Sequence, residues 1–110
     1  MANARLQPRY PLPYLNRAIA YLSTEKNDLA LADCDKYLEI DPTQARVYFI
    51  KGLIYEKINK NDEAIADYNK ALQLEAEDVN VYVDRGRAYL AKNYFDEAFS
   101  DFNKAIKINP

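Results

Sequence analysis

Apolar residues recur along this chain at intervals of three and four positions, the spacing that gathers side chains on one face of an α-helix. The pattern is clearest around a short polar turn, Asn59 to Asp62, which separates two such stretches. The apolar positions are Tyr48, Ile50, Leu53, Ile54 and Ile58 before the turn, and Ala64, Ile65, Tyr68, Ala71, Leu72 and Leu74 after it. The pattern therefore predicts two amphipathic helices joined by a tight turn.

The same arrangement occurs three times, because the sequence repeats with a period of 34 residues. A shift by one period superimposes tyrosines, aspartates, lysines and small residues from all three copies, which chance does not explain. The aligned sets include Tyr14, Tyr48 and Tyr82; Tyr21, Tyr55 and Tyr89; Ala18, Gly52 and Gly86; Ala30, Ala64 and Ala98; and Cys34, Tyr68 and Phe102. We expect repeats at 11–44, 45–78 and 79–110, with helices near 12–24, 28–40, 45–58, 62–74, 79–92 and 96–108.

The side-chain chemistry of the chain excludes most enzymatic mechanisms. The chain has no histidine and a single cysteine, Cys34. Ser/His/Asp and Cys/His sites, an intrachain disulfide and a zinc site of thiolates and imidazoles are therefore ruled out. Lys and Arg number 15 and Asp and Glu 17, so the net charge is −2, and this balance argues against binding to nucleic acid or to anionic membranes. We expect no enzyme activity, no cofactor, no metal site, and no nucleic-acid or membrane partner.

The start of the chain carries no targeting signal. No apolar run approaches the roughly 20 residues that cross a bilayer, and residues 1–13 lack the apolar stretch of a signal peptide. Together with the unpaired Cys34, this predicts a cytoplasmic location. Residues 1–10 are expected to be a flexible leader, or to fold back onto residues 11–110 through Leu6 and Tyr10.

The repeat resembles the tetratricopeptide repeat (TPR), whose pattern is an aromatic residue, Gly or Ala, Tyr, then Ala, an aromatic residue, Ala and Pro. The matching residues are Tyr48, Gly52, Tyr55, Ala64, Tyr68 and Ala71 in the second repeat, and Tyr82, Gly86, Tyr89, Ala98, Phe102, Ala105 and Pro110 in the third. The first repeat departs at Cys34 and Tyr37, and Ala76 replaces proline in the second. The resemblance implies an all-α fold, a right-handed α-solenoid of three antiparallel helix pairs.

Most of the repeating residues are expected to be structural. Gly52 and Ala64 would let the helices of a pair approach closely, whereas the tyrosines and Phe102 would fill the wedge between neighbouring pairs. Aspartate and lysine also recur three residues apart on the second helices, a spacing that suits exposed ion pairs. These pairs are Asp33 and Lys36, Asp67 and Lys70, and Asp101 and Lys104, and they predict a solvated outer face.

The resemblance places function on the concave side, where the first helices of successive repeats line a groove that receives a segment of another protein. The lining residues would be Leu12, Leu15, Ile19, Leu22, Arg46, Phe49, Leu53, Glu56, Lys57, Asn80, Val83, Arg87 and Leu90. Because most of them are apolar, we expect a largely apolar ligand, oriented by Arg46, Lys57 and Arg87 at the edge of the groove. Any single residue of the set could instead lean onto the neighbouring helix.

One variant of the family grips the C-terminal carboxylate of heat-shock chaperones with a clamp of Lys, Asn, Asn, Lys and Arg. In this chain the five places hold Leu15, Ile19, Ile50, Asn80 and Asp84. Leucine and isoleucine cannot donate a hydrogen bond to a carboxylate, and Asp84 would repel one. We therefore expect that the groove is not of this clamp type.

The alternative function is structural, with the groove or the ends of the array packed against copies of the same chain. Three repeats are about the minimum for a stable solenoid, and terminal repeats normally need a polar outer face. The apolar residues expected on the last face are Phe99, Phe102, Ile106 and Ile108. A homo-oligomer formed through this face is one expectation, and a piece of a longer or shortened array is another.

Overall fold

The computed structural model describes residues 10–110, which form six helices and no strand. The helices are α2 (Leu12–Ser23), α3 (Asn27–Ile40), α4 (Ala45–Lys57), α5 (Asn61–Leu74), α6 (Val79–Ala91) and α7 (Phe95–Ile108). Each end lies within one residue of the sequence prediction. The expectations for the segment before Tyr10 lie outside the described residues.

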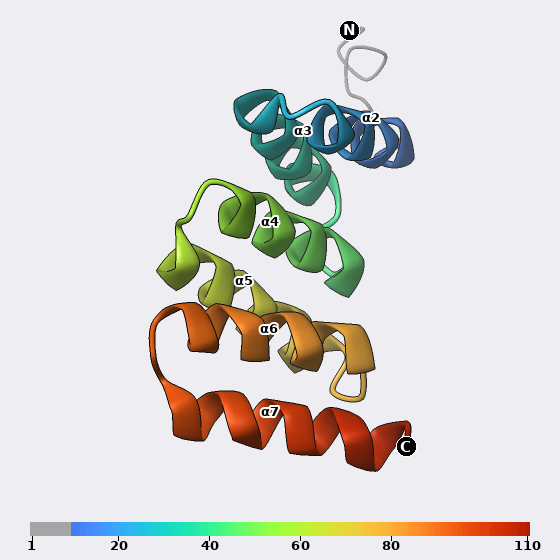
Figure 1. The fold of residues 1–110 in the computed structure, drawn as a ribbon. Helices are drawn as coiled ribbons and strands as arrows, with labels where there is room; N and C mark the ends of the chain where they lie inside the picture. Colours follow the sequence, from blue (N-terminus) through green and yellow to red (C-terminus); the bar gives the residue numbers. More distant parts are fainter. Residues whose placement is uncertain (1–9) are drawn as a thin grey trace, which may run out of the picture.

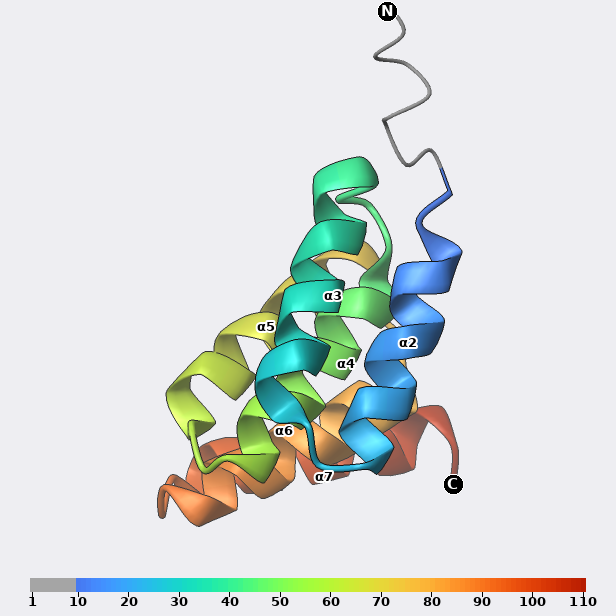
Figure 2. The ribbon, with the colours of Figure 1, turned by 90° about the horizontal axis from the view of Figure 1, so that it is seen from above.

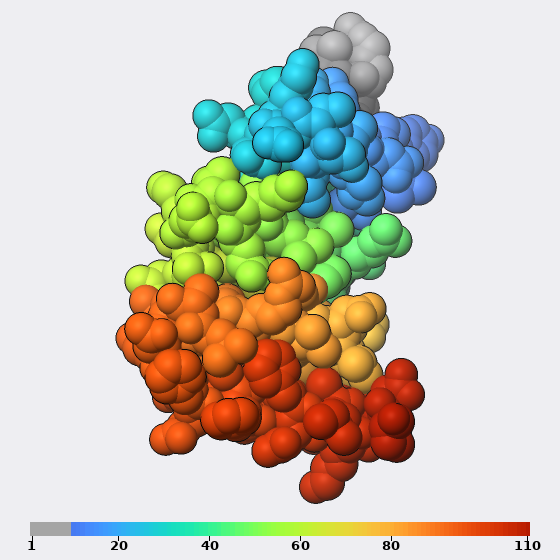
Figure 3. All heavy atoms as spheres, viewed as in Figure 1, coloured from blue at the N-terminus to red at the C-terminus, as the bar shows by residue number. Residues whose placement is uncertain are grey.

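The helices form three antiparallel pairs that stack in chain order (Figure 1). The stack measures 55 × 26 × 20 Å, and Figure 3 shows the three repeats in succession from α2 to α7. A view along the stack shows that each pair is turned relative to the one before it (Figure 2). The fold is thus the predicted all-α solenoid of helix pairs.

The turn inside each repeat has the same backbone geometry. One residue adopts a left-handed conformation in each turn, Glu25 (φ 61°), Asn59 (φ 62°) and Asn93 (φ 64°). The amide of the next residue donates to a tyrosine carbonyl five positions earlier, as in Lys60 to Tyr55 at 2.8 Å. This bond satisfies a carbonyl that the helix end would leave unpaired. Because the same bond and a left-handed residue at the same position occur in all three turns, the backbone conformation of the turns also repeats every 34 residues.

Each of two core clusters joins one repeat to the first helix of the next. The first combines residues of α2 and α3 with Val47, Ile50 and Ile54 of α4. The second combines residues of α5 with Val81 and Ala88 of α6. Burial is therefore shared across every internal junction, as in a solenoid whose repeats depend on their neighbours.

The aromatic residues of the second helices lie against glycines of their own repeat. A Cβ atom at Gly52 would overlap the ring of Tyr68, and one at Gly86 would lie 2.6 Å from a ring carbon of Phe102. The prediction placed these rings between neighbouring pairs, and it is correct only in part. Tyr68 does belong to the core that reaches α6, but its ring also occupies the space that the absent Gly52 side chain leaves.

The prediction of an exposed aspartate–lysine face is wrong for the aspartates, although the three lysines are exposed. Asp33 and Asp101 are buried, at 4% and 3% exposed, and each pairs with an arginine 16 residues earlier on the first helix of its own repeat. Arg17 donates to Asp33 through Nε at 2.8 Å and Nη2 at 2.7 Å. Arg85 donates to Asp101 in the same way, at 2.9 Å and 2.6 Å. These bidentate pairs connect the two helices of a repeat.

The middle repeat has a lysine where the other two have arginine, and its pairing differs. Lys51 forms its ion pair with Asp35 of the preceding repeat, at 3.0 Å, because an ammonium group lacks the planar fork of a guanidinium. Burial raises the pKa of Asp67 to about 6, although the nearby charge of Lys51 opposes the shift and that of Asp35 adds to it. Asp67 is thus the least satisfied member of the aspartate series.

We expect Asp67 to make the protein more stable just below pH 6 than above it. A carboxyl group with a raised pKa takes up its proton at a higher pH when folded than when unfolded, where the value is 3.8. The stabilisation is therefore present at low pH and is lost as the pH rises through about 6. Urea unfolding at several pH values should show this loss for the parent chain and a smaller one for Asp67→Asn. Equal pH dependence in both proteins would contradict the assignment, and Glu63→Gln serves as an exposed control.

Candidate binding groove

A hollow of about 320 Å³ is lined by residues of all three first helices. Its lining residues are Leu22 of α2, Leu53, Glu56 and Lys57 of α4, and Arg87 of α6. All five lie at positions that the sequence assigned to the groove. The helical period places them on one side of their helices, and the stacking of the pairs then sets the three helices beside one another.

The residues assigned to the groove differ in exposure. Leu15 is a correction, because it is only 5% exposed and belongs to the first core cluster, so it offers almost no surface to a ligand. Half-buried positions are Ile19, Leu22, Phe49, Leu53, Glu56 and Val83. Exposed positions are Leu12, Arg46, Lys57, Asn80, Arg87 and Leu90. The surface is therefore a partly covered apolar strip with polar groups at its edge.

Phe49 shows why the strip is less open than the sequence suggests. It packs against both core clusters, and its ring lies 5.9 Å from that of Tyr68, centroid to centroid. Leu53 also contacts both clusters. These side chains lean onto the neighbouring helices, the alternative considered for any single groove residue, and they still reach the surface with part of their area.

A buried tyrosine supports the acidic group of the hollow. The hydroxyl of Tyr68 donates to Oε1 of Glu56, while the Tyr68 ring is fully buried. Burial and this hydrogen bond both raise the pKa of Tyr68, so the hydroxyl keeps its proton and remains a donor. Glu56 is therefore held in place from beneath by α5.

Asp84 and Arg87 form an ion pair beside the hollow. Arg87 Nη1 donates to Asp84 Oδ1 at 2.8 Å, and burial raises the pKa of Asp84 against the opposing charge of Arg87. The carboxylate of Glu56 acts in the same direction as burial. Two acidic groups thus lie near one another, with the exposed cations Lys57 and Arg87 at the rim.

Sequence reasoning missed the roles of Tyr68 and Asp84. Tyr68 was read as core, which its ring is, but a buried phenol also needs a hydrogen-bond partner. The signal was available, because the equivalent residues Cys34 and Phe102 have no hydroxyl group. The sequence analysis names Asp84 only as a clamp position and Arg87 only as a groove-edge residue. It therefore does not predict the ion pair between them.

No metal-binding or membrane-spanning feature is found in residues 10–110. These residues contain no group of three or more acidic or cysteine side chains placed to hold a metal ion. None of their helices has the length and apolar character to cross a bilayer.

Four models of one repeat family match the chain. A model described as TPR repeat matches residues 52–93. Three models described as Tetratricopeptide repeat match residues 13–44, 34–66 and 79–110. Together they extend from residue 13 to residue 110. No curated protein sequence matches the chain.

Several solved structures share the fold. A crystal structure of MamA has a TM-score of 0.86 at 24% identity, over 89% of this chain and 57% of its own. The first TPR of Spaghetti (RPAP3), bound to the HSP90 peptide SRMEEVD, has a TM-score of 0.88 at 24% identity, over 91% and 79%. The Arabidopsis OM64 TPR domain has a TM-score of 0.88 at 19% identity, over 91% and 83%. The chain thus spans little more than half of the MamA structure, and the likeness concerns the fold.

Proposed function

This chain belongs to the tetratricopeptide repeat family, whose domains generally mediate protein–protein interaction, and we propose that its concave face binds a peptide segment of a partner protein. The observation that carries the proposal is the hollow of about 320 Å³ shared by α2, α4 and α6. A binding site built from three repeats has a fixed shape because the cores on both sides of α4 hold its walls. A site of that kind suits recognition, and we propose no catalytic role for it.

The chemistry of the hollow favours an apolar side chain next to an acidic one. Leu22 and Leu53 supply apolar walls, so burial of an apolar side chain between them is favourable. Lys57 and Arg87 are exposed at the rim, where they can pair with a carboxylate of the ligand. Glu56 is already bonded by Tyr68 and adds a fixed acceptor for a backbone amide.

The proposal excludes capture of a free C-terminal carboxylate by the five clamp positions. Leu15 and Ile50 are buried in the first core cluster, at 5% and 7% exposed. Asp84 is acidic and already paired with Arg87. The fold is shared with a TPR structure bound to the peptide SRMEEVD. The three positions that would carry cations in a clamp hold Leu15, Asn80 and Asp84 here, and none of these side chains is positively charged.

A peptide library tests the proposal. Peptides selected on the parent chain should be rich in apolar residues with a nearby acidic one, and amidation of their C-termini should leave the affinity unchanged. Lys57→Glu should weaken the selected peptides by about tenfold, because it places a carboxylate against the ligand's own. Isothermal calorimetry measures both effects.

Lys60→Glu is the matched control, because it makes the same charge change on an exposed residue in the turn after α4, outside the hollow. Its affinity for the peptides should equal that of the parent. If the two variants bind alike, or if binding requires a free C-terminal carboxylate, the proposed groove is wrong.

A further inference from the structure

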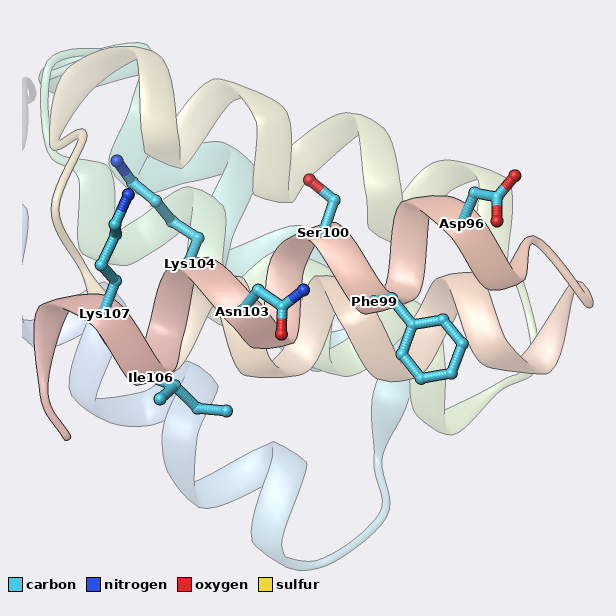
Figure 4. Close-up of a pocket in the computed structure, with 7 residues that line it drawn as sticks. All are labelled: Asp96, Phe99, Ser100, Asn103, Lys104, Ile106 and Lys107. Carbon is cyan, nitrogen blue, oxygen red and sulfur yellow. The ribbon is translucent and has the colours of Figure 1, made fainter.

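The outer face of α7 leaves two large apolar side chains uncovered by any other described residue. Phe99 and Ile106 are 63% and 62% exposed. Figure 4 shows both side chains standing out from α7, with Asn103 between them, over a shallow hollow lined by this helix alone. Phe102, expected on the same face, lies instead against Gly86 of α6, and Ile108 is half-buried.

The equivalent faces of α3 and α5 are each covered by the next first helix. One and two periods before Phe99 stand Ile65 and Leu31, and before Ile106 stand Leu72 and Leu38. Leu31 and Leu38 pack on the cluster that contains Val47 and Ile54 of α4. Ile65 and Leu72 pack on the cluster that contains Val81 and Ala88 of α6. The uncovered face of α7 therefore corresponds to the faces of α3 and α5 on which α4 and α6 pack.

A polar pair accompanies the apolar contact at both internal junctions. Lys51 of α4 forms an ion pair with Asp35 of α3 at 3.0 Å. Nη1 of Arg85 in α6 donates to Oδ1 of Asn69 in α5 at 2.7 Å. Asp35 and Asn69, the acceptors of these two contacts, stand one period apart, and Asn103 stands one period further on. Asn103 is exposed on α7.

The first helix of the chain, α2, carries the matching donor. Arg17 stands one period before Lys51 and two before Arg85. Like Arg85, it bonds the aspartate of its own repeat through Nε and Nη2. Arg85 uses Nη1 for the junction with the preceding repeat, whereas Nη1 of Arg17 has no bond to any residue in 10–110. The Arg17 side chain is 58% exposed.

The rest of the outer face of α2 resembles that of α6. Pro13, Asn16 and Ala20 stand at the positions of Val81, Asp84 and Ala88. Val81 and Ala88 are 1% and 0% exposed under α5, so small side chains at these positions fit a close junction. Pro13, Asn16 and Ala20 are all exposed in the single chain. Shape and hydrogen-bonding groups on α2 thus both complement the uncovered face of α7.

We propose that copies of this chain associate head to tail, with α2 of one copy docked on α7 of the next. Arg17 of the first copy donates through Nη1 to the side-chain oxygen of Asn103 in the second, and Ala20 covers the apolar surface of Phe99 and Ile106. Such a contact joins two different surfaces and does not close on itself, so it extends the solenoid into a short filament. The two faces lie outside the hollow, and the proposal is independent of peptide binding.

Two blocked variants test the direction of assembly. Ala20→Arg places a long side chain on the head face, and Ile106→Arg places one on the tail face; both residues are exposed, so folding should be unaffected, as circular dichroism can check. In sedimentation equilibrium the parent should grow in mass with concentration beyond a dimer. Each variant alone should remain a monomer, and an equimolar mixture should form a one-to-one dimer and nothing larger.

A matched pair of substitutions at Asn103 tests the polar contact. Asn103→Asp, which copies Asp35 of α3, should strengthen association, and Asn103→Lys should weaken it by about tenfold through repulsion of Arg17. A parent chain that stays monomeric at the highest attainable concentration would overturn the proposal. Dimerisation of Ala20→Arg by itself would also overturn it, because that result shows association without the α2 face. Equal association of the two Asn103 variants would refute the assigned hydrogen bond.

Discussion

Replacement of Arg85 by alanine should lower the free energy of unfolding by about 3 kcal/mol, because it leaves a buried carboxylate without its partner. Asp101 has a side-chain exposure of 4%, and Arg85 supplies both of its charge-assisted hydrogen bonds. The same change removes the bond from Nη1 to Asn69 that connects α6 with the preceding repeat. One substitution thus weakens a repeat and a junction together.

Arg17→Ala is the matched control, since Arg17 bonds Asp33 with the same two nitrogens. Its side chain is 58% exposed against 20% for Arg85, so water replaces more of the lost interaction. We expect a clearly smaller loss of stability, measured by urea unfolding at neutral pH. An Arg85→Ala protein no less stable than Arg17→Ala would show that the buried pair contributes little. Restoration of stability by a second change, Asp101→Leu, would confirm that the unpaired charge is the cause.

The helices were predictable because their signals are local and repeated three times. Apolar spacing fixed each helix to within one residue, and the period gave the pairing of helices into repeats. The aspartate series was misread for a related reason. The rules for a single helix connect residues three or four apart, whereas the true partners lie 16 residues away on the facing helix. The recurrence of a basic residue at Arg17, Lys51 and Arg85 was the missed signal.

For the residues assigned to the candidate groove, the side of the helix was predictable but the burial was not. The period assigns a residue to one side of its helix, and Leu22, Leu53 and Arg87 accordingly meet at one hollow. Burial depends on how far the pairs turn as they stack, which the sequence does not state. Leu15 therefore falls into the core, and Tyr68 reaches Glu56 from α5.

Gly52→Ala should destabilise the protein by up to about 2 kcal/mol, although alanine favours helix more than glycine does. The added methyl group would overlap the ring of Tyr68, which is fully buried and has no free space to move into. Overpacking of this kind costs about 1 to 3 kcal/mol, and the gain in helix propensity offsets about 1 kcal/mol of it, which leaves a net loss of up to about 2 kcal/mol. Thermal and urea unfolding measure the balance, and a stabilised Gly52→Ala protein would contradict the observed packing.

The first repeat already contains the compensated form of this contact. There Ala18 stands at the position of Gly52, and Cys34 stands at the position of Tyr68, both fully buried in the same cluster. In a Tyr68→Cys background the Gly52→Ala change should therefore reverse its sign and stabilise the protein, since the ring is gone and only the helix propensity remains. If Gly52→Ala is equally destabilising in both backgrounds, the loss of stability arises within α4 and not from contact with the Tyr68 ring. A reversal would assign it to the ring, and would explain why this chain pairs a small first-helix residue with a large second-helix one.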